Sequence, residues 1–99
     1  MNAPSAFALS VIDVLIMVLG FYKWIIIIGA ILSWLVAFGV INKYNRVVQG
    51  ISDAIFRITE PVLKPIRRIL PPMGGFDLSP LVLIFIIIFL QLFLARLEY

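Results

Sequence analysis

The sequence predicts an all-α membrane protein, a two-helix transmembrane hairpin with a long first helix and an amphipathic, proline-broken connecting segment on the cytoplasmic surface. Of its 99 residues, 64% are hydrophobic and only 13% are charged, whereas a soluble domain is near half apolar and a quarter charged. Two long uncharged runs flank a basic stretch that holds most of the cationic side chains. A chain of this length forms a single domain, so residues 1–99 are treated as one unit.

The two uncharged apolar runs occupy residues 24–41 and 78–95. As helices, each is ~27 Å long, which approaches the ~30 Å of a bilayer's hydrocarbon core. Runs of this length are too long for strands of a small domain. We therefore expect the first transmembrane helix over about residues 6–41 and the second over residues 78–97.

The first helix is expected to begin well before the uncharged run. Residues 5–22 are also apolar apart from Asp13, and no proline or clear turn separates them from the run that follows. A helix over 6–41 would be ~54 Å long, so it must tilt, bend or continue against a partner. The alternative is a third span. A cleavable signal peptide is not expected, because residues 1–10 contain no lysine or arginine.

Residues 45–70 are expected to form a surface amphipathic segment, since apolar residues recur on one helical face from Val47 to Ile58. Pro61 should end this helix, because a residue that precedes proline avoids the α region, and Pro65 should restrict its predecessor in the same way. Ser79 and Pro80 are expected to cap and open the second span.

The connection between the spans carries six of the eight cationic side chains. They are Lys43, Arg46, Arg57, Lys64, Arg67 and Arg68. The positive-inside rule then predicts a bacterial inner-membrane protein whose connection is cytoplasmic and whose termini are both periplasmic.

Small residues follow one face of the first span, where Gly29, Ser33 and Ala37 are four residues apart. This spacing allows close approach of two helix backbones. We expect packing against the second span, with a homodimer or another subunit as the alternative. The Gln91 amide should bond inside the hairpin, to Ser33 or to a backbone carbonyl.

The charged residues have two interpretations each. Asp13 and Lys23 could mark an ion path or a partner contact, or lie at the outer interface with Lys23 snorkelling. Lys64, Arg67 and Arg68 could contact anionic lipid head groups or an acidic patch of a partner, or serve only as a topology signal. No nucleic-acid partner is expected, because no aromatic platform accompanies the cluster.

Three segments resemble signatures of the YggT family of small bacterial and plastid membrane proteins. Residues 32–34 resemble its LSW motif, residues 59–71 its TEPxLxPIRRxxP core, and residues 74–80 its GGxDxSP element. The matching positions are Ser33, Trp34, Thr59, Glu60, Pro61, Pro65, Arg67, Arg68, Gly74, Gly75, Asp77, Ser79 and Pro80. The resemblance covers about residues 20–95 and one copy of the unit. It departs at Ala30, where many members have arginine, and over residues 35–41, which lack the usual proline.

The resemblance implies a link with osmotic tolerance and with cell-division gene clusters. In plastids it implies a link with the assembly of cytochrome b haem or with nucleoid distribution. No catalytic residue is agreed for the family. The chain itself has no histidine, no cysteine and no phosphate-binding glycine loop, so we expect no enzyme, cofactor or metal site. Direct haem ligation would require methionine or tyrosine.

The expected function is a non-enzymatic membrane adaptor, or an assembly or accessory subunit of a larger membrane complex, for example a respiratory or photosynthetic one. Its expected partners are anionic membrane lipids and other transmembrane subunits or a homo-oligomer. The alternative is an oligomeric component or modulator of ion or osmolyte transport in osmotic stress.

Overall fold

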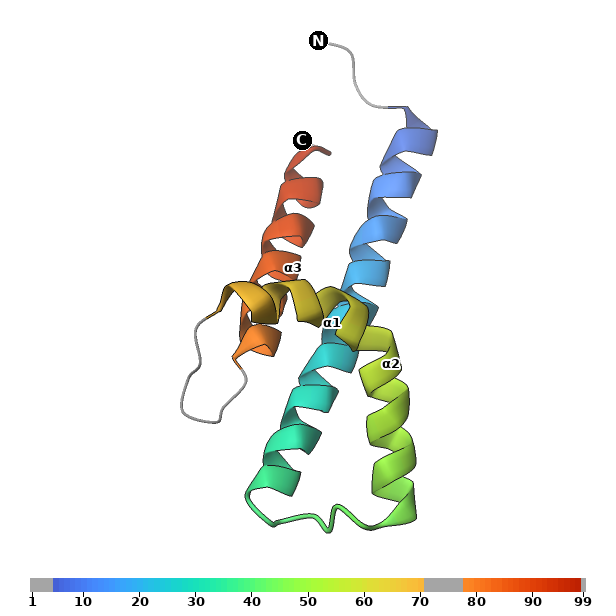
Figure 1. The fold of residues 1–99 in the computed structure, drawn as a ribbon. Coiled ribbons are helices and arrows are strands. Elements are labelled where there is room, and N and C mark those ends of the chain that lie inside the picture. The colour runs from blue at the N-terminus through green and yellow to red at the C-terminus, as the bar shows by residue number, and fades with distance from the viewer. Residues whose placement is uncertain (1–4, 71–77, 99) are drawn as a thin grey trace.

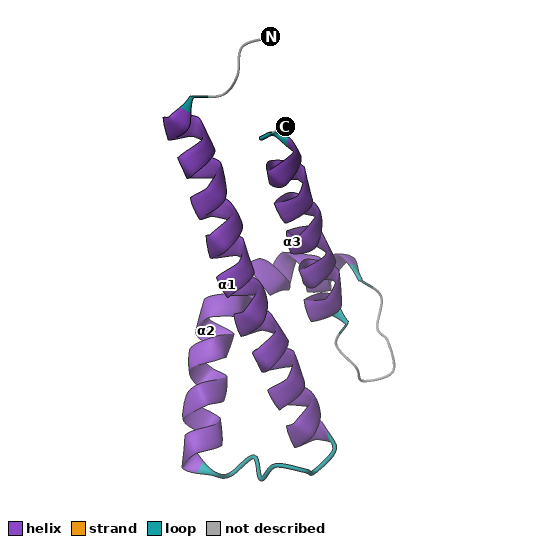
Figure 2. Cartoon of the chain, turned by 180° about the vertical axis from the view of Figure 1, so that it is seen from behind, coloured by secondary structure: helices purple, strands orange, loops and turns teal. Residues whose placement is uncertain are grey.

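The computed structural model describes residues 5–70 and 78–98, and this part of the chain contains three helices. They are α1 (Ala6–Ala37), α2 (Arg46–Ile69) and α3 (Ser79–Arg96), with no strand in the described part (Figure 1). α1 and α3 run antiparallel, so that the start of α1 and the end of α3 lie at the same end of the molecule (Figures 1 and 2). The predicted all-α class is confirmed, but the connecting segment forms a third full helix.

α1 and α3 are each long and apolar enough to cross a membrane. In their most apolar windows only 11% and 22% of residues are buried, whereas the core helix of a soluble protein would be mostly buried. Their exposed faces therefore indicate a membrane protein. α1 has 32 residues and α3 has 18, or ~48 Å against ~27 Å, so much of α1 extends beyond the helix that it pairs with.

α1 ends at Ala37, four residues before the end of the apolar run. Gly39 has a φ of 75°, a left-handed conformation that glycine adopts without steric cost. The Val40 N–H then donates to the carbonyl of Leu35 at 2.9 Å. This is the hydrogen bond of a Schellman motif, which closes the helix although the apolar sequence continues.

The first residues of α2 and α3 are capped in different ways. The Asn45 side chain accepts from the Val47 N–H at 2.8 Å and so caps α2. α3 has Leu78 as its N-cap, without a side-chain cap. Ser79, which we expected to be the cap, is instead the first helical residue and is fully buried, with Pro80 following it.

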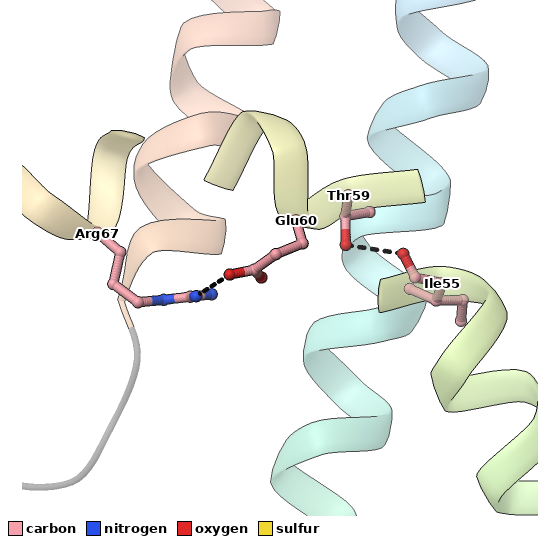
Figure 3. A network of polar contacts seen from close by, with 4 residues as sticks. All are labelled: Ile55, Thr59, Glu60 and Arg67. Carbon is pink, nitrogen blue, oxygen red and sulfur yellow. Dashed lines mark hydrogen bonds and ion pairs between the residues drawn. The ribbon is translucent and has the colours of Figure 1, made fainter. Parts of the chain in front are cut away.

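The prediction that proline would break the connection is wrong, because α2 contains both Pro61 and Pro65 within one helix. The helix bends instead, and its second part turns across α1 and α3 (Figures 1 and 2). Pro61 has no N–H to donate four residues back. Just before it, the Thr59 hydroxyl donates to the carbonyl of Ile55 at 2.8 Å (Figure 3). Both features are known causes of helix bending.

The core lies where the second part of α2 meets α1 and α3. Ile26, Leu63, Leu83 and Ile87 are buried against one another there. The Tyr22 hydroxyl donates to the carbonyl of Ile58 at 2.9 Å and joins α1 to α2 beside this cluster. The core therefore fixes the position of the bend relative to the hairpin.

Candidate functional site

A cavity of about 650 Å³ lies between the C-terminal half of α1 and α2 and reaches α3 at Pro80. We call it the cleft. Its size falls within the range of ligand pockets, ~300–1,000 Å³. Its apolar lining includes Ile26, Ala30, Trp34, Phe38, Ile55, Phe56 and Leu63, and its polar lining is Ser33, Ser52, Thr59, Glu60 and Arg67.

The cleft begins beside a close approach between α1 and α2. A Cβ atom added to Gly29 would lie 2.6 Å from Cγ2 of Ile55, so only glycine fits this position. Our expectation that this face of α1 packs on the second span is therefore wrong for Gly29, whose close contact is with α2. Ser33 and Ala37, one and two turns further on, are exposed and line the cleft.

Aromatic side chains form much of the cleft's exposed surface. Phe38 is 66% exposed and Phe56 is 58% exposed, and both line the cavity together with Trp34. Exposed aromatic area that borders a concave apolar surface is characteristic of binding sites. The cleft is therefore suited to an apolar or amphipathic ligand.

One end of the cleft carries an ion pair. Nη1 of Arg67 lies 2.5 Å from Oε1 of Glu60, and the two side chains are 42% and 20% exposed (Figure 3). They are two helical turns apart on the same face of α2, with Glu60 directly before Pro61 at the bend and Arg67 beyond it. Lys64 and Arg68 do not line the cleft and are exposed. The three cations that we grouped by sequence therefore divide between two surfaces.

A polar contact joins α1 to α3. Lys23 donates from Nζ to Oε1 of Gln91 at 3.1 Å, and Nε2 of Gln91 donates to the Ile16 carbonyl at 3.2 Å. Gly20 leaves room for the amide, since a Cβ atom there would lie 3.2 Å from Nε2. Gln91 thus bonds a backbone carbonyl, as one of our two alternatives expected. The other alternative, Ser33, lies in the cleft instead.

A carboxyl pair lies where α3 ends beside the first part of α1. A hydrogen bond with Asp13 raises the pKa of Glu98, with smaller contributions from burial and from the like charge of Asp13. The sequence pointed to Asp13 and Lys23 but not to this pair, because Glu98 is 85 positions from Asp13 and only the antiparallel register brings the two carboxyl groups together.

Metal-ligating groups do not gather within residues 5–70 and 78–98, where no three His, Cys, Asp or Glu side chains could hold an ion. The motif residues Gly74, Gly75 and Asp77 lie outside the described residues.

The sequence signatures converge on the cleft from separate parts of the chain. Residues from the first span, the connection and the second span all contribute to its lining. They are Ser33, Trp34, Thr59, Glu60, Arg67 and Pro80. Pro61, Pro65 and Arg68 are exposed, and Ser79 is buried next to Pro80. The cleft is therefore the candidate functional site.

A long and a short apolar helix, joined by a bent amphipathic one, define the class of small all-helical proteins with two candidate membrane spans. Within that class the chain belongs to the CCB3/YggT family, whose model matches residues 8–97. The resemblance seen in the sequence is thereby confirmed.

Relatives of the chain occur in bacteria and in Porphyra. An uncharacterized protein of Haemophilus influenzae is 43% identical over 74 residues, which cover 75% of this chain and 36% of the relative. The uncharacterized protein YggT of Escherichia coli K12 is 33% identical over 76 residues, which cover 74% of this chain and 34% of the relative. The uncharacterized protein ycf19 of Porphyra purpurea is 39% identical over 70 residues, which cover 71% of this chain and 63% of the relative.

The chain thus spans about a third of the length of these two bacterial relatives. No solved structure matches it.

Proposed function

We propose that the chain is a non-enzymatic membrane adaptor, an assembly or accessory subunit that holds a segment of a partner protein in the cleft. The observation that carries this proposal is the cleft itself, where three motif segments meet around exposed aromatic side chains. Amphipathic helices commonly dock by placing their apolar face in such a groove.

The small core supports the same proposal. Among the described residues only five hydrophobic side chains are buried, while large ones on α1, α2 and α3 remain exposed. Lipid can cover the exposed faces of the two spans, whereas the side chains of a protein partner can fill the cleft and also pair with Glu60 and Arg67 at its end. A protein partner would complete the hairpin on this side.

We further propose that the membrane is a bacterial inner membrane, with α2 on its cytoplasmic side and both termini in the periplasm. The support is the charge distribution, since six of the eight cationic side chains lie between residues 43 and 68. The cleft would then face a cytoplasmic or juxtamembrane segment of the partner complex.

Site-specific photocrosslinking tests the adaptor proposal. A photoreactive phenylalanine analogue replaces Phe56, which lines the cleft and is 58% exposed, or Phe89 of α3, which is 65% exposed and outside the cleft. In intact membranes the Phe56 probe should give a discrete protein adduct and the Phe89 probe should react with lipid. No protein adduct at Phe56, or the same adducts from both positions, would overturn the proposal.

A second candidate function, as an oligomeric component or modulator of ion or osmolyte transport, is favoured by the contact between Lys23 and Gln91. Ionisable residues within apolar spans often mark such pathways. Reconstituted protein should then mediate flux that Lys23→Ala alters. Absence of flux from proteoliposomes that contain folded protein would exclude this candidate and leave the adaptor proposal intact.

A further inference from the structure

We infer that the outer face of α2, beyond its bend, binds the phosphate head groups of anionic phospholipids. Two edges of the helix form this surface, which we call the outer face of α2: an apolar edge with Val62 and Ile69, and a cationic edge with Lys64 and Arg68, ~100–160° further around the helix. It is distinct from the cleft, so the inference is independent of the proposed adaptor function.

The direction of this part of α2 is the first argument. Beyond Pro61 the helix runs across α1 and α3 rather than alongside them (Figures 1 and 2). When α1 and α3 cross a bilayer, this segment lies close to the membrane plane. Its buried residue Leu63 packs on Ile26 of α1 and on the start of α3, which places the segment at the end of α3 that carries Ser79.

The distribution of apolar side chains is the second argument. Val62 and Ile69 each lie two residues from a member of the ion pair, Glu60 or Arg67, and therefore ~200° around the helix from it. They project away from the cleft and are 41% and 83% exposed. An in-plane helix that exposes apolar side chains on one side inserts that side among the acyl chains below the head groups.

The cationic side chains are the third argument. Lys64 and Arg68 are four residues apart, share one face and are exposed. Within residues 5–70 and 78–98 the single ion pair is that of Arg67 and Glu60, so neither Lys64 nor Arg68 has a carboxylate partner there. When the apolar edge is inserted among the acyl chains, guanidinium and ammonium groups that project away from it lie near the phosphate oxygens of the head groups, and each contributes ~1 kcal/mol near an anionic leaflet.

The test uses full-length protein in nanodiscs. Because the chain has no cysteine, Ile69→Cys can carry a single environment-sensitive fluorophore. Nanodiscs of phosphatidylcholine alone are compared with nanodiscs that also contain phosphatidylglycerol. The fluorophore should move to a more apolar environment with phosphatidylglycerol, and Lys64→Gln/Arg68→Gln should lower the ratio of inserted to free segment by about thirtyfold.

The matched control removes the same charge elsewhere. Lys43→Gln/Arg46→Gln neutralises one cation in the loop before α2 and one at the first residue of α2, at the opposite end of this helix from the outer face of α2 (Figure 1), and should leave the shift unchanged. Two outcomes would overturn the inference. One is a signal of labelled Ile69→Cys protein that is identical in both lipids, a comparison that requires neither of the charge variants. The other is an equal loss in both double variants, which would indicate general charge attraction.

Discussion

The close approach at Gly29 predicts that a side chain at this position destabilises the packing of α1 against α2. In Gly29→Ala the new Cβ atom would lie 2.6 Å from Cγ2 of Ile55, whereas ordinary contacts begin at 3.4 Å. The helices must therefore separate by about 0.8 Å or Ile55 must change its rotamer. As a β-branched residue in a helix, Ile55 has little rotamer freedom, so we expect an overpacking cost of ~1–3 kcal/mol.

Gly50 provides the matched control, since it lies in α2 with nothing within 4 Å of the position of an added Cβ atom. Gly50→Ala should stabilise the protein by ~0.5–1 kcal/mol through helix propensity. Measured by reversible unfolding in bicelles, the free energy of unfolding of Gly29→Ala should be ~1–3 kcal/mol lower than that of Gly50→Ala. Ile55→Ala removes Cγ2, so in that background Gly29→Ala should lose its cost.

Two results would refute this reasoning. Equal unfolding free energies for Gly29→Ala and Gly50→Ala would mean that α1 and α2 are not in close contact at Gly29. A cost of Gly29→Ala that persists unchanged in the Ile55→Ala background would mean that the added methyl group meets a different neighbour.

Three further predictions concern the polar contacts and the bend. Gln91→Leu removes the acceptor of Lys23 and should lower the free energy of unfolding by ~1–3 kcal/mol, less in a background where Lys23 is methionine. Pro61→Ala restores a helix N–H, so the distance between spin labels on the two parts of α2 should increase as the helix straightens. The raised pKa of Glu98 means that its protonated form is favoured in the folded chain. Its contribution to stability is therefore complete below the unfolded-state pKa and disappears as pH rises through the folded pKa. Glu98→Gln or substitution of Asp13 by asparagine should remove this pH dependence, measured by unfolding across the titration.

The helices were predictable because length and periodicity determine them. The uncharged runs located α1 and α3, and the amphipathic pattern located the first part of α2. The early end of α1 had a signal in Gly39, which has a φ of 75°. The behaviour of Pro61 and Pro65 was not predictable from local rules. Burial of Leu63 and the contact between Tyr22 and Ile58 hold the helix together across the bend, and these are tertiary interactions.

The candidate site was predictable only as a set of motif positions. Sequence spacing put Lys64, Arg67 and Arg68 in one cluster, but in the structure Arg67 pairs with Glu60 and lines the cleft, whereas Lys64 and Arg68 do not line it. Gln91 was recognised as needing an internal partner. Its partners, Lys23 and the carbonyl of Ile16, depend on the register of α1 against α3. A uniformly apolar sequence does not specify this register.

The central claim is that α1 and α3 cross the membrane and place α2 on the side opposite to the chain ends. Because the chain has no cysteine, single substitutions Ser10→Cys, Lys64→Cys and Glu98→Cys can be tested with a membrane-impermeant maleimide in intact and in opened cells. The account predicts that positions 10 and 98 react in intact cells, and that position 64 reacts only after opening. Reaction of position 64 in intact cells together with the other two would contradict it.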